Sequence, residues 1–129
     1  MRALNVRQRW VGRSGREESV VVAGGLKRTL DRLSELGEIT SRPMFGGHGI
    51  YWRDVLFGMV FRGRLYFKVD EESKGDYLAR GMGPFRPNEQ QTLKSYYEVP
   101  SDVLDDPEAL LSWAREAIRA EISSQDRAG

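Results

Sequence analysis

The hydrophobic pattern of the first half of the chain predicts one helix followed by a small sheet. Four leucines recur at spacings of three and four, and the glycine after the last of them is a natural stop: Leu26, Leu30, Leu33, Leu36 and then Gly37. Aromatic and β-branched residues then fill three stretches, 45–52, 55–61 and 64–69. Only two residues separate consecutive stretches, which predicts antiparallel hairpins because a parallel crossover needs about a dozen residues or more.

The second half predicts two further helices around a strand. The stretch 71–81 favours a short helix despite Gly75 inside it, and 92–99 favours a strand that Pro100 ends. The last helix has a complete start signal, with Asp106 as cap, Pro107 at the first helical position and an acid after it. Its apolar residues form one stripe that we expect to pack on the sheet: Leu110, Trp113, Ala114, Ala117, Ile118 and Ile122.

A two-residue turn at 62–63 would fix the register of the central hairpin. Val60 would then lie opposite Leu65, with Gly58 opposite Phe67 and Leu56 opposite Val69, and with Tyr51 on that same face. The other face would carry Trp52, Val55, Phe57, Met59, Phe61, Arg64, Tyr66 and Lys68. Both faces are largely apolar, so either helices cover both or the second face meets a partner.

This second face is the candidate partner-binding surface. Its members are Trp52, Phe57, Met59, Phe61, Arg64, Tyr66 and Lys68. The same mixture of aromatic and basic residues resembles a platform for single-stranded RNA, although the stretch from Arg62 to Val69 departs from the RNA-recognition signature. A core or protein interface is the favoured interpretation.

The glycine-rich stretch from Arg42 to Trp52 holds the only histidine of the sequence. A phosphate-binding loop would need its glycines to open a helix, whereas these lead into a strand-like segment. Glycines within a strand pattern mark a bulge or a close backbone approach, so we expect a structural bend. His48 has no cysteine and no evident acidic partner, so neither a zinc site nor a general base is expected there.

Composition restricts the chemistry further. The sequence of 129 residues has the length of one domain, and its net charge of +1 demands no polyanionic partner. The absence of cysteine excludes disulfides, thiolate zinc sites, iron–sulfur clusters and a cysteine nucleophile. The longest apolar run, 55–61, is far shorter than the about 20 residues of a membrane-spanning helix, and no secretory signal is evident.

Charged residues suggest no catalytic constellation. The adjacent acid pairs, such as Glu71-Glu72 and Asp105-Asp106, do not converge on one substrate, and no nucleophile–base order appears. We therefore expect no catalytic residue, no metal and no cofactor. The first 16 residues hold five arginines and no acid, so residues 1–19 are expected to form a basic extension, with a domain at 20–124 and a short end at 125–129.

Three ordered blocks stand out in the sequence. The first is the structural motif Arg42, Pro43, Met44, Phe45, Gly46 and Gly47, followed by Gly49 and Tyr51. The second is 65–70, and the third joins Tyr96, Tyr97, Val99 and Pro100 to Leu110, Trp113 and Ala114. With these blocks, about residues 25–120 resemble the N-terminal domain of the TfoX/Sxy competence regulators.

The resemblance implies an α+β fold of the secretion-chaperone-like type. Its order would be α-β-β-β-α-β-β-α, with helices packed on an antiparallel sheet and a short extra strand near Phe85. It further implies a cytoplasmic bacterial regulator of competence-gene transcription that acts by protein contact, without catalytic residues. The expected partner is a transcription regulator or a second copy of the chain. The alternative is a nucleic-acid-binding module that uses the arginine-rich extension and the aromatic–basic strand face.

Overall fold

The computed structural model describes residues 25–128 of the chain. The first element, α2 (Gly25–Leu33), continues into a short 3-10 turn, η1 (Ser34–Leu36). Gly37 follows with a φ of 116°, which a residue with a side chain rarely adopts, so the chain leaves the helix there. The predicted first helix and its stop are therefore confirmed, whereas the predicted basic extension 1–19 lies outside the described residues.

The sheet has six antiparallel strands in the order β1-β2-β3-β4-β6-β5. Their bounds are β1 (Ile39–Met44), β2 (Gly47–Trp52), β3 (Val55–Phe61), β4 (Arg64–Lys68), β5 (Pro84–Asn88) and β6 (Gln91–Glu98). The short helix α3 (Lys74–Leu78) joins β4 to β5. The α+β class and the antiparallel sheet are confirmed, and the order contains one strand more than expected, namely β1.

Strand β1 was not predicted because it is polar and contains a proline. Arg53 N–H donates to the carbonyl of Glu38 over 2.9 Å, so this pair is hydrogen-bonded. Hydrogen-bonded and non-hydrogen-bonded pairs alternate along an antiparallel ladder, so the pair of Pro43 with His48 is a non-hydrogen-bonded one. The backbone nitrogen of Pro43 therefore faces the open edge of the sheet. Proline is tolerated there because it lacks the N–H that would otherwise be left unpaired, and it also discourages pairing with another chain.

A bulge in β3 changes which side chains share a face. The predicted pairs Val60–Leu65 and Gly58–Phe67 are confirmed. On the other side of β3, however, Ile50 pairs with Gly58 and Tyr51 pairs with Leu56, so one residue of β3 has no partner on β2. A bulge of this kind reverses the alternation beyond it. The predicted faces were therefore wrong for Tyr51, Trp52, Val55, Leu56 and Phe57.

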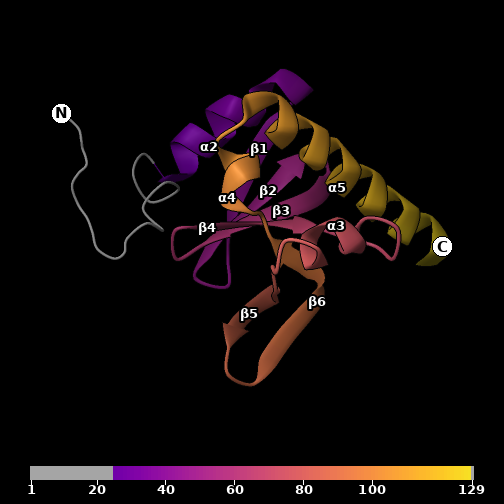
Figure 1. Ribbon diagram of the computed structural model, residues 1–129. Helices are drawn as coiled ribbons and strands as arrows, with labels where there is room; N and C mark the ends of the chain where they lie inside the picture. Colours follow the sequence, from indigo (N-terminus) through magenta and orange to yellow (C-terminus); the bar gives the residue numbers. More distant parts are fainter. Residues whose placement is uncertain (1–24, 129) are drawn as a thin grey trace.

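Helices cover one face of the sheet. The long helix α5 (Pro107–Ala128) crosses β3 and β4, with α2 and the short α4 (Ser101–Leu104) beside it (Figure 1). Asp106 caps α5 as predicted, because its Oδ1 accepts the N–H groups of Glu108 and Ala109 over 3.1 and 3.2 Å. The predicted stripe packs on the sheet through Leu110, Ala114, Ala117 and Ile118. No helix in residues 25–128 has the length and hydropathy needed to cross a membrane.

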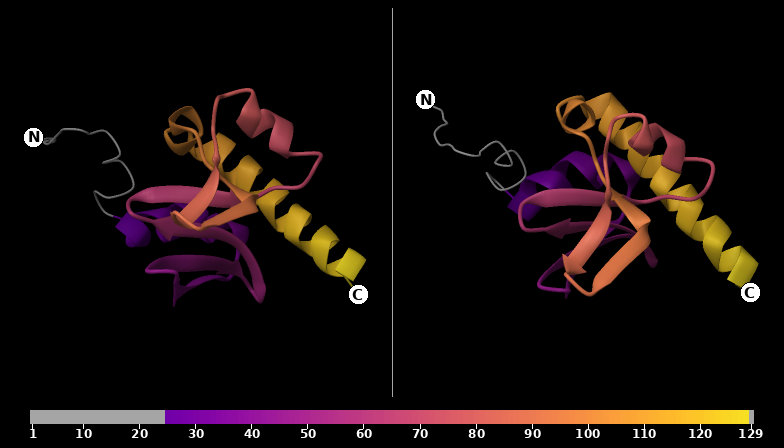
Figure 2. Two further views of the ribbon diagram at one scale, coloured as in Figure 1. Left: turned by 90° about the horizontal axis from the view of Figure 1, so that it is seen from below. Right: turned by 60° about the horizontal axis from the view of Figure 1, so that its bottom comes forward.

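The β5–β6 hairpin covers the opposite face. Its pairing shifts register between Pro84 and Phe85, and it projects from the sheet on the side away from α5 (Figures 1 and 2). Phe85 is fully buried there against residues of β3, β4 and β6. This second apolar cluster contains Met59, Phe61, Tyr66, Phe85 and Tyr96. The sheet therefore has a core on each side, one under helices and one under a hairpin.

Candidate functional site

The predicted partner-binding face is not a surface. Phe57 is 0% exposed and belongs to the core under the helices. Met59, Phe61 and Tyr66 are 4%, 8% and 8% exposed and lie under the β5–β6 hairpin. The expectation that this face is open was wrong, because neither the bulge nor the covering hairpin was anticipated. The expectation of a homodimer rested on the same face and loses that support.

The basic members of that face are engaged in ion pairs. Lys68 Nζ lies 3.0 Å from a carboxylate oxygen of Glu121 on α5 and 5.5 Å from the ring centroid of Tyr96. Arg64 Nη1 lies 2.8 Å from Glu98 Oε2. Burial, together with the nearby Glu121, raises the pKa of Tyr96 above its usual range. These contacts connect β4 to α5 and to β6, so the strand face does not form the aromatic–basic platform considered as the alternative.

The glycine block forms the β1–β2 turn and a close contact with β3. Phe45 and Gly46 both have positive φ, 55° and 84°, as the favoured two-residue hairpin turn requires. A Cβ on Gly47 would overlap the carbonyl oxygen of Val60. A Cβ on Gly49 would lie 3.0 Å from Leu56 Cδ1. Close backbone approach, one of the two expected explanations, accounts for Gly47, whereas Gly49 leaves room for the side chains of Leu56 and Met44.

The remaining motif residues surround this turn without forming a binding site. Arg42 stacks over the ring of Tyr51 at 5.0 Å, and Met44 packs against the second cluster. His48 is half-buried opposite Val60, and no hydrogen bond or ion pair involves its imidazole in the described part of the chain. Within residues 25–128, no group of three or more His, Asp or Glu side chains is placed to hold a metal ion.

A network around Arg119 fixes α5 against the loop before α3. Arg119 lies 3.1 Å from Asp70, 3.4 Å from Glu72 and 2.9 Å from Glu116. Burial alone would raise the pKa of Asp70, but hydrogen bonds from Arg119 and Ser73 outweigh it and hold that pKa at about 2. The carboxylate accepts the N–H of Ser73 over 2.9 Å. The network therefore has a structural explanation, namely the position of α5.

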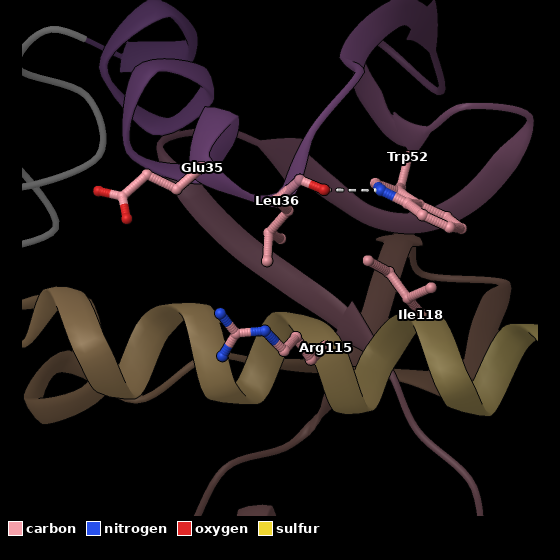
Figure 3. Close-up of a pocket in the computed structure, with 5 residues that line it drawn as sticks. All are labelled: Glu35, Leu36, Trp52, Arg115 and Ile118. Carbon is pink, nitrogen blue, oxygen red and sulfur yellow. Dashed lines mark hydrogen bonds between the residues drawn. The ribbon is translucent and has the colours of Figure 1, made fainter.

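An open cleft lies between η1 and α5, at the end of β2. Its lining residues are Glu35, Leu36, Trp52, Arg115 and Ile118 (Figure 3), and we call it the Trp52 cleft. Its volume is about 300 Å³, near the lower end of the range typical of ligand pockets.

Trp52 is held rigidly in this cleft. Its indole Nε1–H donates to the carbonyl of Leu36 over 2.8 Å (Figure 3). A Cβ on Gly37 would lie 3.4 Å from that nitrogen, so the glycine leaves room for the indole as well as ending η1. The guanidinium of Arg53 stacks over the indole at 4.6 Å. A bonded and stacked indole forms a preorganised apolar wall.

The rim of the Trp52 cleft carries two opposite charges that do not pair. Glu35 extends from η1, and Arg115 rises from α5 toward it (Figure 3). Both side chains are exposed, and within residues 25–128 no hydrogen bond or ion pair engages either of them. Leu36, Trp52 and Ile118 form the apolar part of the cleft, beside the two charged side chains (Figure 3). The arrangement can accept an apolar group flanked by polar groups of both signs.

Sequence analysis identified Trp52 but placed it on the wrong face. Leu36 and Ile118 were predicted as core residues, which they also are in part. Glu35 and Arg115 carried no signal, because an acid and an arginine 80 positions apart are common surface residues. Only the packing of η1 against α5 brings them to one cleft.

Comparison with known proteins supplies the family context. The model of the TfoX N-terminal domain matches residues 31–121. The DNA transformation protein TfoX1 of Aliivibrio fischeri (strain ATCC 700601 / ES114) is 30% identical over 94 residues, which cover 71% of this chain and 45% of that protein. The chain therefore spans less than half the length of this curated relative.

Proposed function

The chain belongs to the TfoX N-terminal domain family, and from this premise we propose that it is a non-catalytic regulatory domain that acts by binding another protein. The similar protein from Aliivibrio fischeri is called a DNA transformation protein. We extend that role to this chain as control of genes for DNA uptake, exerted in the cytoplasm through a transcription regulator.

The observation that carries the proposal is the Trp52 cleft. It combines an indole fixed by a 2.8 Å hydrogen bond with aliphatic walls and two exposed charges of opposite sign that no residue of 25–128 pairs with. A segment of a partner protein that inserts one apolar side chain and offers a carboxylate to Arg115 and a cation to Glu35 would satisfy all these groups. Central apolar anchors with a polar rim are the usual anatomy of protein interfaces.

The expected energetics divide between the anchor and the rim. Burying one leucine- or phenylalanine-sized side chain contributes about 1.5–3 kcal/mol. An exposed ion pair at Arg115 or Glu35 contributes about 0.2–1 kcal/mol, so the charges would mainly decide which segment binds and in which direction. The cleft by itself therefore supports a weak, specific contact that other parts of the partner would reinforce.

Photo-crosslinking in the native host tests where the partner binds. A photoreactive amino acid replaces Arg115 in the cleft or, as a matched control, Lys94, an exposed residue of β6 in the hairpin that projects from the opposite side of the sheet. We expect a crosslinked protein from position 115 only, identified by mass spectrometry. The purified partner should then bind the wild type and the Lys94→Glu variant equally, and the Arg115→Glu and Glu35→Lys variants less tightly.

Two outcomes would contradict the proposal. A partner that crosslinks from position 94 and not from position 115 would place the interface elsewhere. Equal affinity of the purified partner for the wild type and for both rim variants would show that the cleft takes no part in binding. Thermal melting of each variant serves as the control for folding, since Glu35 and Arg115 are exposed and their replacement should leave stability nearly unchanged.

A further inference from the structure

An exposed aromatic ring and two arginines come together where the tips of the hairpins meet. Phe45, in the β1–β2 turn, is 46% exposed and touches Phe85 edge to face at 6.1 Å. Phe85 in turn lies 5.1 Å from Phe61, the last residue before the β3–β4 turn. Arg62 follows in that turn, and Arg86 follows Phe85 on β5. We call Phe45, Arg62 and Arg86 the hairpin-tip surface.

The two arginines line one open cavity of about 500 Å³. Its other lining residues are Pro87 and Asn88 at the end of β5, and Glu89 and Gln90 in the turn to β6. Arg86 is oriented by two hydrogen bonds, from Nη1 to Thr92 Oγ1 over 2.9 Å and from Nη2 to the carbonyl of Glu89 over 3.4 Å. These bonds hold the guanidinium in place and leave other N–H groups of its five available for an anion.

Arg62 occupies a conformation that arginine rarely adopts. Its φ is 50°, and Gly63 after it has a φ of 78°, the geometry of a turn that favours asparagine or glycine at the first position. Its guanidinium stacks over Phe61 at 5.0 Å, and no ion pair within residues 25–128 engages it. Arg62 is therefore an exposed cation that lines the same cavity as Arg86.

We propose that the hairpin-tip surface binds single-stranded nucleic acid. The two arginines would contact backbone phosphates, and the exposed ring of Phe45 would stack on an unpaired base. Stacking requires a base outside a duplex, which favours a single strand over double-stranded DNA. Glu89 is the one acid lining the cavity and opposes the anion. This surface differs from the expected strand face and is independent of the Trp52 cleft.

Fluorescence anisotropy with a labelled oligothymidylate tests this site on the full chain. A length of about 12 nucleotides falls within the usual range of single-strand sites. The site variants are Phe45→Ala and the pair Arg62→Asn with Arg86→Ala. Asparagine suits the turn, so folding should be spared at position 62. The control pair, Arg28→Ala with Arg53→Asn, removes the same charge from exposed positions in α2 and the β2–β3 turn, and Arg53 has a positive φ like Arg62.

The proposal predicts different effects for the two pairs. The site pair should weaken binding at least about tenfold and reduce the slope of log affinity against log salt by about 1.4, because each phosphate contact to a single strand contributes about 0.7. The control pair should weaken binding less than about twofold, since long-range charge alone is screened. Phe45→Ala should weaken binding at least about fivefold, and Glu89→Gln should strengthen it.

Three results would overturn the proposal. The first is failure of the wild type to bind the oligonucleotide at about 0.1 M salt, where exposed charges more than about 10 Å apart are largely screened. Equal losses for the site and control pairs would assign binding to general electrostatics, including the basic residues 1–16, which all variants retain. The third is equal affinity for duplex DNA together with no effect of Phe45→Ala. That result would show that Phe45 does not stack on a base and that the surface does not prefer single strands.

Discussion

Replacing Phe85 by alanine tests whether the β5–β6 hairpin seals the second face of the sheet. The side chain is 0% exposed and lies 4.7 Å from the ring of Tyr66, 5.1 Å from Phe61 and 6.1 Å from Phe45. Truncation of a buried phenylalanine costs about 3–5 kcal/mol, and three ring contacts place this site in the upper part of that range. We expect a loss of about 4 kcal/mol in the free energy of unfolding.

Urea denaturation measures this loss, and Phe45→Ala provides a matched control. Phe45 is half exposed and has one ring contact, so its truncation should cost about 1 kcal/mol. With a slope of about 2 kcal/mol per M, Phe85→Ala should lower the midpoint by about 2 M without a change of slope. If Phe85→Ala costs no more than Phe45→Ala, the hairpin does not seal the face, and the aromatic residues of β3 and β4 become available to a partner again.

Three further predictions concern the glycine block, the α5 network and the cleft. Gly47→Ala should lower the free energy of unfolding by about 1–3 kcal/mol in urea denaturation, because its Cβ would overlap a β3 carbonyl. The control Gly75→Ala in α3, which has open space around it, should raise the free energy of unfolding by about 0.5–1 kcal/mol. The pKa of Asp70 is lowered to about 2, so its carboxylate should stabilise the fold by up to about 2 kcal/mol. This stabilisation should be complete above about pH 5 and should vanish as the pH falls through about 2. Thermal melts of Asp70→Asn should lack this part of the acid dependence. Trp52→Phe should lower the free energy of unfolding by about 1 kcal/mol, because the hydrogen bond to Leu36 is lost. Calorimetry measures this change, and an unchanged melting temperature would contradict a fixed indole.

Much of the fold follows from local patterns in the sequence. The turn at 62–63 fixed the pairing of Val60 with Leu65, because a two-residue loop allows only one register. Asp106 and Pro107 set the start of α5, since capping depends on adjacent residues. These features depend on neighbours in the chain, which a sequence displays directly.

The misplaced face depends on features that the sequence does not display. The bulge that leaves Phe57 unpaired interrupts no visible alternation, because Val55, Leu56 and Phe57 are all apolar. The β5–β6 hairpin covers the second face through Phe85, and its strand pairing shifts register next to that residue. An apolar second face was therefore detected correctly, but its explanation as a partner surface was wrong, since a hairpin from later in the chain buries it.

The candidate sites depend on contacts between distant segments. Glu35 and Arg115 meet at the Trp52 cleft only because η1 packs on α5. Arg62 and Arg86 share a cavity only because the β5–β6 hairpin projects toward the β3–β4 turn. Neither pair has a spacing or motif that points to the other, so only the tertiary structure reveals them.

Transcription of DNA-uptake genes in the native host tests the central claim most directly. The chromosomal gene would carry Arg115→Glu, at the rim of the Trp52 cleft, or the control Lys94→Glu, which makes the same change of charge on β6. We predict that Arg115→Glu lowers these transcripts at an unchanged level of folded protein, and that Lys94→Glu leaves them at the wild-type level. Wild-type transcript levels in both Arg115→Glu and Glu35→Lys would contradict the account.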